Sequence, residues 1–206
     1  MTNSGSFLRL MKSSRAQRPL TIAISGSHST GKTSLAAQLQ QALTKLSFSV
    51  TASDEPIRQL EHGNKLRAGG PGYLKLLTIH FERLNRCATD LLLLDRSLID
   101  FWSYLHVEQQ APPEIIALTE QLLPAYLSQV DHHFFLPIEF SVKADGYRPI
   151  DEGFRKKISD EILTGVADEQ HSQLTGSPTQ RISRALAVIH DLIETRAVSR
   201  SATISI

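Results

Sequence analysis

The sequence is poor in cysteine and has no long apolar run. Cys87 is the single cysteine among 206 residues, so an internal disulfide cannot form and a thiolate cluster for zinc is missing. This composition suits a reducing compartment, and we expect a cytoplasmic protein. Unbroken apolar runs such as Leu91 to Leu94 fall far short of the ~20 residues that a membrane helix requires. We therefore expect a soluble protein without a transmembrane segment.

Net charge is also nearly absent. The chain has 22 basic and 21 acidic residues, a formal net charge of +1, whereas nucleic-acid-binding proteins usually carry a marked basic excess. We therefore expect no nucleic acid partner. With 41% hydrophobic residues the chain is long enough for one sizeable core and short for two, which indicates one α/β domain.

Acidic residues are missing from the start of the chain, where the first is Asp54. Residues 1–19 combine arginines and a lysine with several serines. A transit peptide or a basic arm for an anionic surface has this composition. We favour a disordered extension, because chain termini are commonly poorly ordered.

The strongest motif is Gly26-Ser27-His28-Ser29-Thr30-Gly31-Lys32-Thr33, which fits the phosphate-binding pattern G-x-x-x-x-G-K-[S/T]. The apolar run 20–25 precedes it and predicts a buried strand, and leucines at helical spacing over residues 33–46 follow it. The loop's N–H groups must converge on an anion at a helix N-terminus, so this strand, loop and helix order is the setting that the motif requires.

The residue types in the loop predict separate roles. Gly26 and Gly31 let the backbone approach phosphate oxygens, Lys32 is expected on the β and γ phosphates, and the Thr33 hydroxyl is expected to bind Mg²⁺. His28 and Ser29 are expected to contribute only main chain. The predicted nucleotide-binding residues of the loop are Gly26, Ser27, His28, Ser29, Thr30, Gly31, Lys32, Thr33 and Ser34.

Asp95 and Arg96 follow the leucine run 91–94. A short apolar run that ends in an acid, downstream of a phosphate-binding loop, is typical of a central strand with a Walker B aspartate. We expect Asp95 to hold Mg²⁺ beside Thr33 and Arg96 to point into the same pocket.

Asp54, Glu55 and Arg58 follow a second predicted strand, residues 48–51. Ligands of open parallel sheets gather at the carboxyl ends of the strands, where a carboxylate can orient a substrate hydroxyl or accept its proton. Alternatively, the two acids open a helix with Pro56 at its first position. Glu55 is the stronger candidate for substrate contact, with Arg58 and Arg96 beside it.

The rest of the chain alternates helical and extended patterns, as an α/β sandwich requires. Further helices are predicted over residues 73–89, 97–105, 114–127, 154–162 and 178–195, and further strands within residues 130–137 and 171–177. In the helix 73–89 we expect Leu74, Leu77, Phe81, Leu84 and Ala88 to be buried and Lys75, Glu82, Arg83 and Arg86 to be solvated. His132 and His133 are adjacent on a strand, so they point to opposite faces and do not suit one metal ion.

Two arginines are candidates for a lid over the phosphates. Arg148 lies in a turn between a glycine and a proline, and Arg155 follows in the next helix. An arginine on a mobile segment can neutralise transition-state charge and exclude water. Arg148 is the first choice and Arg155 the second, although either can instead pair with Asp151 or Glu152.

Together these motifs resemble the NadR-type P-loop family, which includes ribosylnicotinamide kinases, and more distantly deoxynucleoside and thymidylate kinases. The resemblance rests on Gly26 to Thr33, Glu55-Pro56 with Arg58, Asp95-Arg96-Ser97, Leu136 to Phe140, Asp145 to Arg148 with Phe154-Arg155, and Thr175-Gly176-Ser177 with Arg181. It implies a P-loop NTPase three-layer α/β/α sandwich of the kinase-like branch, with a mainly parallel five-stranded sheet. It also implies that Glu55 and the Asp95-Arg96 pair meet the acceptor and that Gly176 and Ser177 border the nucleotide base.

We therefore predict one P-loop domain over residues 20–196, between the extension 1–19 and a loose tail 197–206. Its expected function is Mg²⁺- and ATP-dependent phosphoryl transfer to a small nucleoside- or nucleotide-like acceptor, with Lys32, Asp95, Arg148 and Glu55 as catalytic residues. The sequence does not separate ATP from GTP. The alternative is a regulatory switch that hydrolyses a nucleoside triphosphate and acts through a protein or membrane partner.

Overall fold

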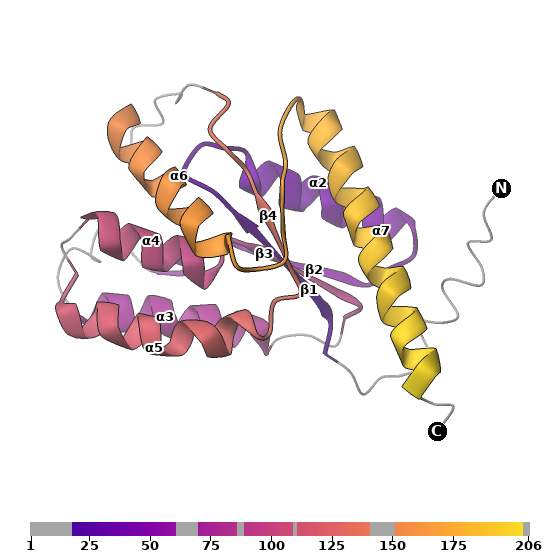
Figure 1. Cartoon of the computed structure of the whole chain (residues 1–206), viewed down its shortest axis with the longest axis horizontal. Helices are drawn as coiled ribbons and strands as arrows, with labels where there is room; N and C mark the ends of the chain where they lie inside the picture. Colours follow the sequence, from indigo (N-terminus) through magenta and orange to yellow (C-terminus); the bar gives the residue numbers. More distant parts are fainter. Residues whose placement is uncertain (1–17, 61–69, 86–88, 109–110, 141–150, 204–206) are drawn as a thin grey trace.

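Five parallel strands form one sheet in the order β2-β3-β1-β4-β5, with helices on both faces (Figure 1). The computed structural model describes residues 18–60, 70–85, 89–108, 111–140 and 151–203. The strands are β1 (Leu20–Ser25), β2 (Val50–Ser53), β3 (Leu91–Asp95), β4 (His132–Phe135) and β5 (His171–Gln173). The described helices are α2 (Lys32–Lys45), η1 (Pro56–Gln59), α3 (Gly70–Leu84), α4 (Leu98–Glu108), α5 (Pro113–Leu127), α6 (Glu152–Val166) and α7 (Pro178–Thr203). This arrangement confirms the predicted three-layer α/β/α sandwich.

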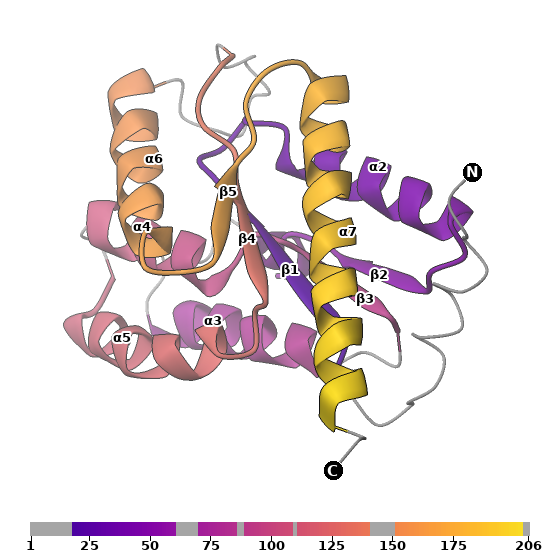
Figure 2. The same ribbon diagram turned by 45° about the vertical axis from the view of Figure 1, so that its right-hand side comes forward.

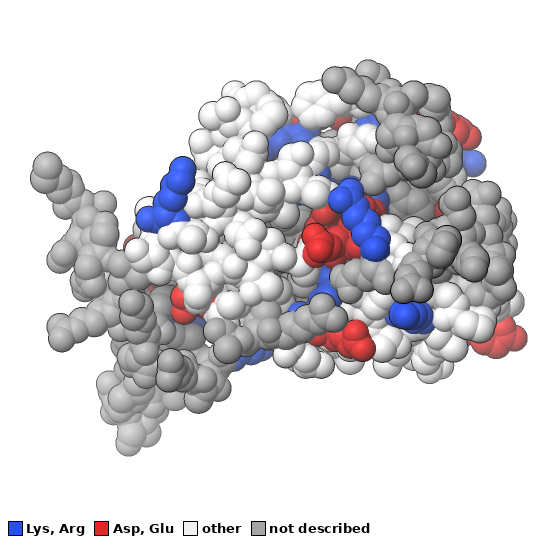
Figure 3. All heavy atoms as spheres, turned by 180° about the vertical axis from the view of Figure 1, so that it is seen from behind, with Lys and Arg blue, Asp and Glu red and all other residues white. Residues whose placement is uncertain are grey.

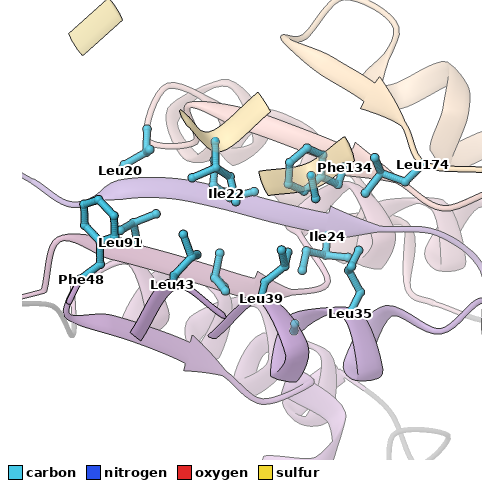
Figure 4. Close-up of a cluster of buried hydrophobic side chains, with 14 of the residues drawn as sticks. Leu20, Ile22, Ile24, Leu35, Leu39, Leu43, Phe48, Leu91, Phe134 and Leu174 are labelled. Atoms are coloured by element: carbon cyan, nitrogen blue, oxygen red, sulfur yellow. The ribbon is translucent and has the colours of Figure 1, made fainter. Parts of the chain in front are cut away.

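The central strands are buried on both sides because their sequences are almost continuously apolar. β1 pairs with β3 and β4, so Ile22 lies beside Leu93 on one side and His132 on the other. Alternate residues face opposite layers. Figure 4 shows Ile22 and Ile24 on the side of the sheet that faces the leucines of α2, and residues of α7 belong to the same cluster. Ala23 packs with α3, α4 and α5. Each fully buried Leu or Ile contributes roughly 1.5–3 kcal/mol relative to an exposed one.

The two helical layers lie on opposite sides of the sheet. Figure 2 shows α7 and α2 together on one side and α4 with α6 on the other. A smaller cluster joins α4 to α6 through Ile99, Phe135, Ile158, Ile162 and Val166. Because all strands run in parallel, the residues that follow β1, β2 and β3 meet at one edge of the sheet, which is where a ligand site is expected.

Several boundaries differ from the sequence prediction. α7 continues to Thr203, so residues 197–203 are helical and not a loose tail. The apolar stripe ends at Ile193, but no glycine or proline follows Pro178 to stop the helix. α3 starts at Gly70 and not at Tyr73, because Pro71 is tolerated in a first helical turn. β2 covers residues 50–53 and not 48–51. Of the predicted extension 1–19, residues 1–17 lie outside the described residues.

The buried face of α3 was predicted only in part: Leu77 is buried, and Phe81 and Leu84 pack against the core as expected. Leu74 is 45% exposed, whereas Arg83 is only 1% exposed and His80 is also buried. The buried residues of α3 are Tyr73, Leu76, Leu77, Ile79, His80 and Arg83, which recur at helical spacing. The sequence prediction relied on apolar residues alone, so it missed that the polar residues His80 and Arg83 are buried as well.

The surface carries scattered charge. On the face shown in Figure 3, acidic side chains gather near the centre beside basic ones. Most of the described surface around them is uncharged and drawn in white. The helices in the described ranges lack the combination of length and apolar character needed to cross a membrane.

Candidate functional site

The loop between β1 and α2 depends on its two glycines. Gly26 has a φ of 148°, and a Cβ there would lie 2.6 Å from the backbone oxygen of Leu136, so any side chain would push β1 away from the end of β4. Gly31 caps α2 in the left-handed region with a φ of 92°. Only glycine adopts such backbone conformations without strain.

Buried cations hold the loop's carbonyl groups. The four carbonyl oxygens of residues 27–30 accept hydrogen bonds from Lys32 (2.6 Å to the first), from Arg155 (3.1 and 3.3 Å to the next two) and from Arg181 (2.7 Å to the fourth). The C=O and N–H groups of a trans peptide point in opposite directions. Holding the carbonyls on one side therefore presents the loop's N–H groups on the other side, where an anion can bind.

Arg155 does not have the placement expected of a lid residue. Its side chain is fully buried. In addition to the loop, it donates to the carbonyl oxygen of Phe140 (2.7 Å) and to the Glu152 carboxylate (3.1 Å). The structure therefore corrects the lid prediction for Arg155, whose guanidinium supports the loop backbone from the interior.

Arg181 was part of the family resemblance but had no predicted role. It lies near the start of α7 and donates to the Glu139 carboxylate (2.5 Å), which also accepts from the Gly176 N–H (2.9 Å). The hydrogen bond from Arg181 is the main cause that lowers the pKa of Glu139. The turn at Gly176 and Ser177 is thus tied to the loop through Glu139 and Arg181.

Thr33 and Asp95 meet where a metal was predicted. The Thr33 hydroxyl donates to Asp95 Oδ2 (2.6 Å), and Asp95 is buried. Among the described residues, Asp95 Oδ1 is a buried oxygen without a hydrogen-bond partner. Buried polar atoms are normally paired, and carboxylate and hydroxyl oxygens are ligands that Mg²⁺ accepts. The donor set therefore fits Mg²⁺.

Lys32 is folded back onto its own loop. Burial, followed by the charge of Arg96, lowers the pKa of its ammonium from 10.5 to about 7. Its Nζ donates to the Ser27 carbonyl and lies 3.4 Å from the Thr30 hydroxyl. To reach a phosphate, Lys32 must exchange these bonds for phosphate oxygens.

Glu55 is brought to the same pocket, as predicted from its place after the second strand. It is 6% exposed and accepts from Arg96 Nε (2.5 Å), with Arg58 Nε at 3.3 Å, whereas Asp54 is exposed. The pocket is lined by Ser29, Gly31, Lys32, Thr33, Ser34, Glu55 and Arg96. Glu55 also directly precedes the short helix η1, with Pro56 in its first turn. The alternative prediction, that the acids open a helix at Pro56, is therefore confirmed at the same position.

Asp100 is a site residue that the sequence analysis did not identify. It is 1% exposed and accepts hydrogen bonds from the N–H groups of Gly26 (3.1 Å) and Ser97 (2.9 Å). One carboxylate thereby joins the start of the loop to the start of α4. An acid in the first turn of a predicted helix was the available signal.

The remaining predicted residues divide into two groups. His132 and His133 are buried, and burial lowers the pKa of each to about 4; His132 pairs with the Ser172 hydroxyl (3.0 Å). Arg148 and residues 145–147 lie outside the described residues, so the lid role of Arg148 stays a prediction.

Comparisons with known proteins show the family and the fold of the chain. A family model described as an AAA domain matches residues 21–178. No curated protein matches the sequence. Similar solved structures include NadR protein in complex with NR, at 20% identity over 86% of this chain and 52% of that chain, with a TM-score of 0.63. The chain therefore spans about half the length of that NadR structure.

Two enzymes of similar size share the fold. Deoxyadenosine kinase from M. mycoides with bound dATP is 12% identical over 82% of this chain and 99% of that chain, with a TM-score of 0.61. Thymidylate kinase from Ehrlichia chaffeensis is 14% identical over 84% of this chain and 99% of that chain, with a TM-score of 0.59. These likenesses confirm the predicted resemblance and show a P-loop kinase-like fold.

Proposed function

The chain belongs to the AAA domain family that matches residues 21–178, and on this premise we propose that it catalyses Mg²⁺- and ATP-dependent phosphoryl transfer to a small nucleoside- or nucleotide-like acceptor. One observation carries the proposal: a single pocket is lined both by Lys32 and Thr33 of the phosphate-binding loop and by the buried pair of Glu55 and Arg96. A protein that only binds a triphosphate has no need of this pair.

The loop provides the triphosphate half of the reaction. Its N–H groups and Lys32 bind phosphate oxygens, after Lys32 leaves the Ser27 carbonyl. Thr33 and Asp95 would hold Mg²⁺, which neutralises charge on the phosphates when bound. Fixed donors of this kind stabilise the charge of the transition state without reorganising during the reaction.

Glu55 provides the acceptor half. A carboxylate at the carboxyl end of β2 can hydrogen-bond an acceptor hydroxyl and orient it toward the γ phosphate. Arg96 holds Glu55 in place and adds positive charge beside the transferring group. Arg148 closes over that group in this proposal, and the pairing of Arg155 with the loop leaves Arg148 as the candidate lid arginine.

The similar structures support nucleosides and nucleotides as ligands of this fold. Their names report NR in one NadR complex, NAD and AMP-PNP in another, and dATP in the deoxyadenosine kinase. Nucleosides, nucleotides and nicotinamide riboside are therefore the acceptors to be tested first.

The test is turnover of Mg²⁺-ATP by the purified protein, alone and with each acceptor. Lys32→Ala serves as the blank, and Lys45→Ala is the matched control because Lys45 is exposed in the last turn of the same helix. A many-fold increase with one compound identifies the acceptor class. A slow rate that no compound changes contradicts the kinase proposal and favours the switch with a protein or membrane partner.

A further inference from the structure

Arg83 is a buried arginine behind the site that the proposed reaction does not use. It projects from α3, is 1% exposed, and reaches the carboxyl ends of two strands. Its guanidinium donates to the carbonyl oxygens of Asp95 (2.8 Å) and Arg96 (3.1 Å). It also donates twice to the Ser53 hydroxyl, at 2.9 and 2.6 Å.

The acceptors of Arg83 are all uncharged. Within the part of the chain that the structure describes, its hydrogen bonds go to one hydroxyl and two carbonyl groups, and none goes to a carboxylate. His80 lies on the same buried face of α3; burial, followed by the charge of Arg83, lowers its pKa well below the usual 6.5, so it stays neutral. Burial is the main cause that lowers the pKa of the guanidinium, whereas the charges of Asp95, Asp100 and Asp54 favour the cation. Burying a cation that has only neutral hydrogen-bond acceptors is costly, so a simpler side chain would be expected if filling space were the only need.

The geometry of the guanidinium explains why an arginine is present. Ser53 ends β2 and lies two residues before Glu55, whereas Asp95 ends β3 and Arg96 follows it. A planar fork with five N–H donors can bridge both strand ends at once, which a lysine ammonium on a flexible stem cannot do with the same fixed angles. Arg83 therefore sets the position of one strand end relative to the other.

Arg96 needs this support because of its backbone. Its φ of 72° lies in the left-handed region, which is unfavourable for a residue with a Cβ. Such conformations persist where the surroundings determine them, and they concentrate at functional sites. Here the Arg96 N–H donates to the Ile24 carbonyl (3.0 Å) and its carbonyl accepts from Arg83. The side chain is thereby turned toward Glu55.

We propose that Arg83 is a positioning residue that holds the Asp95 carboxylate and the Glu55–Arg96 pair in register with the phosphate-binding loop. The inference rests on the roles proposed above for Asp95 and Glu55. It adds a residue from α3, which contributes no side chain to the lining of the pocket.

Positioning and simple electrostatics predict opposite results for Mg²⁺. The positive charge of Arg83 repels a cation near Asp95, so its removal should strengthen Mg²⁺ binding if charge alone acts. If Arg83 positions Asp95, its removal should weaken Mg²⁺ binding. Loss of a group that orients a metal ligand typically costs about 10- to 100-fold in metal affinity.

The first experiment needs no nucleotide. Hydrogen exchange of the unliganded protein is compared for wild type, Arg83→Met, Arg83→Lys and the control Lys75→Met, an exposed position of the same helix. Arg83→Met should speed exchange in residues 52–58 and 94–98 and leave α7 unchanged. Uniform acceleration across the domain, or no acceleration in these segments, overturns the positioning role. If Arg83→Met does not fold, Arg83→Lys takes its place, because it keeps the charge and loses the fork.

The second experiment measures the affinity for a non-hydrolysable ATP analogue by calorimetry, with and without Mg²⁺. In Arg83→Met we expect about a tenfold smaller enhancement by Mg²⁺ and an affinity without Mg²⁺ within about threefold of wild type. Arg83→Lys should recover only part of the enhancement. A larger enhancement, or equal losses with and without Mg²⁺, contradicts positioning. Failure of the proposed kinase function would appear separately, as wild-type protein that binds the analogue but shows no acceptor-dependent turnover.

Discussion

The two halves of the pocket differ in the groups that form them. The triphosphate half consists mainly of backbone, and its carbonyl groups are fixed by Lys32, Arg155 and Arg181. The acceptor half consists of side chains at strand ends, where Glu55 pairs with Arg96 and with Arg58, whose side chain is 54% exposed. Apart from Lys32, which must leave the Ser27 carbonyl, the backbone of the first half is therefore already held in place. The second half can change its partner by changing a few side chains.

This difference has a direct energetic meaning. Every phosphate group offers the same oxygens, so a fixed cradle of N–H groups suits any nucleoside triphosphate. An acceptor must be distinguished from similar molecules, and that discrimination depends on which polar side chains are left unpaired by the wrong compound. Substitutions in the two halves should accordingly affect different kinetic constants.

The largest effect is expected from Lys32→Ala. Removing the cation that contacts the β and γ phosphates should lower turnover on the order of 10³-fold and weaken triphosphate binding, with the fold intact. Turnover assays and circular dichroism check this, with Lys45→Ala as the control. Normal turnover in Lys32→Ala would remove the phosphate-binding role of the loop.

Arg148→Ala should lower turnover on the order of 10²-fold and leave ATP affinity nearly unchanged, because a lid arginine acts in the transition state.

Arg155→Met should show the contrasting pattern. It leaves the carbonyls of residues 28 and 29 without their donor, so thermal stability and ATP affinity should fall together. Calorimetry and steady-state kinetics separate the two patterns; an unchanged rate in Arg148→Ala eliminates the lid role.

Glu55→Gln should act on the acceptor half alone. The substitution keeps the shape and one hydrogen-bonding oxygen but loses the charge that pairs with Arg96, so acceptor-dependent turnover should fall by about 10- to 100-fold. ATP affinity measured without acceptor should stay within about twofold of wild type. A matched substitution, Asp54→Asn, lies at the neighbouring exposed position and should leave both quantities unchanged. An equal loss in both variants would show that the acidic pair acts through general charge.

The smallest expected effect is a pH dependence of the affinity for ATP, which the triphosphate half binds. Burial lowers the pKa of Lys32 to about 7 in the free protein, and contact with phosphates favours the charged form, so the pKa of Lys32 is higher in the complex. ATP binding therefore takes up a proton between these two values. Affinity should fall by up to about tenfold between about pH 7.5 and about pH 8.5. Calorimetry in two buffers of different ionisation heat measures the proton uptake, and its absence would contradict a neutral Lys32 in the free protein.

The features that could be predicted from the sequence are those that depend on local sequence patterns. The loop was predicted residue by residue because its chemistry needs fixed glycines at fixed spacing, and Asp95 followed because a central strand must be apolar up to its end. Asp100, Arg83 and Arg181 were missed or misplaced because their roles depend on contacts with residues at least 12 positions away. Local periodicity contains no information on such contacts. Arg155 was identified as important, but its partners, and so its role, required the tertiary structure.

The connections of the loop also set the order in which the protein can become competent during synthesis. The motif, residues 26–33, leaves the ribosome before its supports, which lie between residues 100 and 181. Asp100, Arg155 and Arg181 are translated 74, 127 and 151 residues after Gly26, His28 and Thr30, their respective partners. A nascent chain therefore contains the complete motif long before the loop can hold its shape, and nucleotide binding should appear only after Arg181 has been translated and has folded onto the loop.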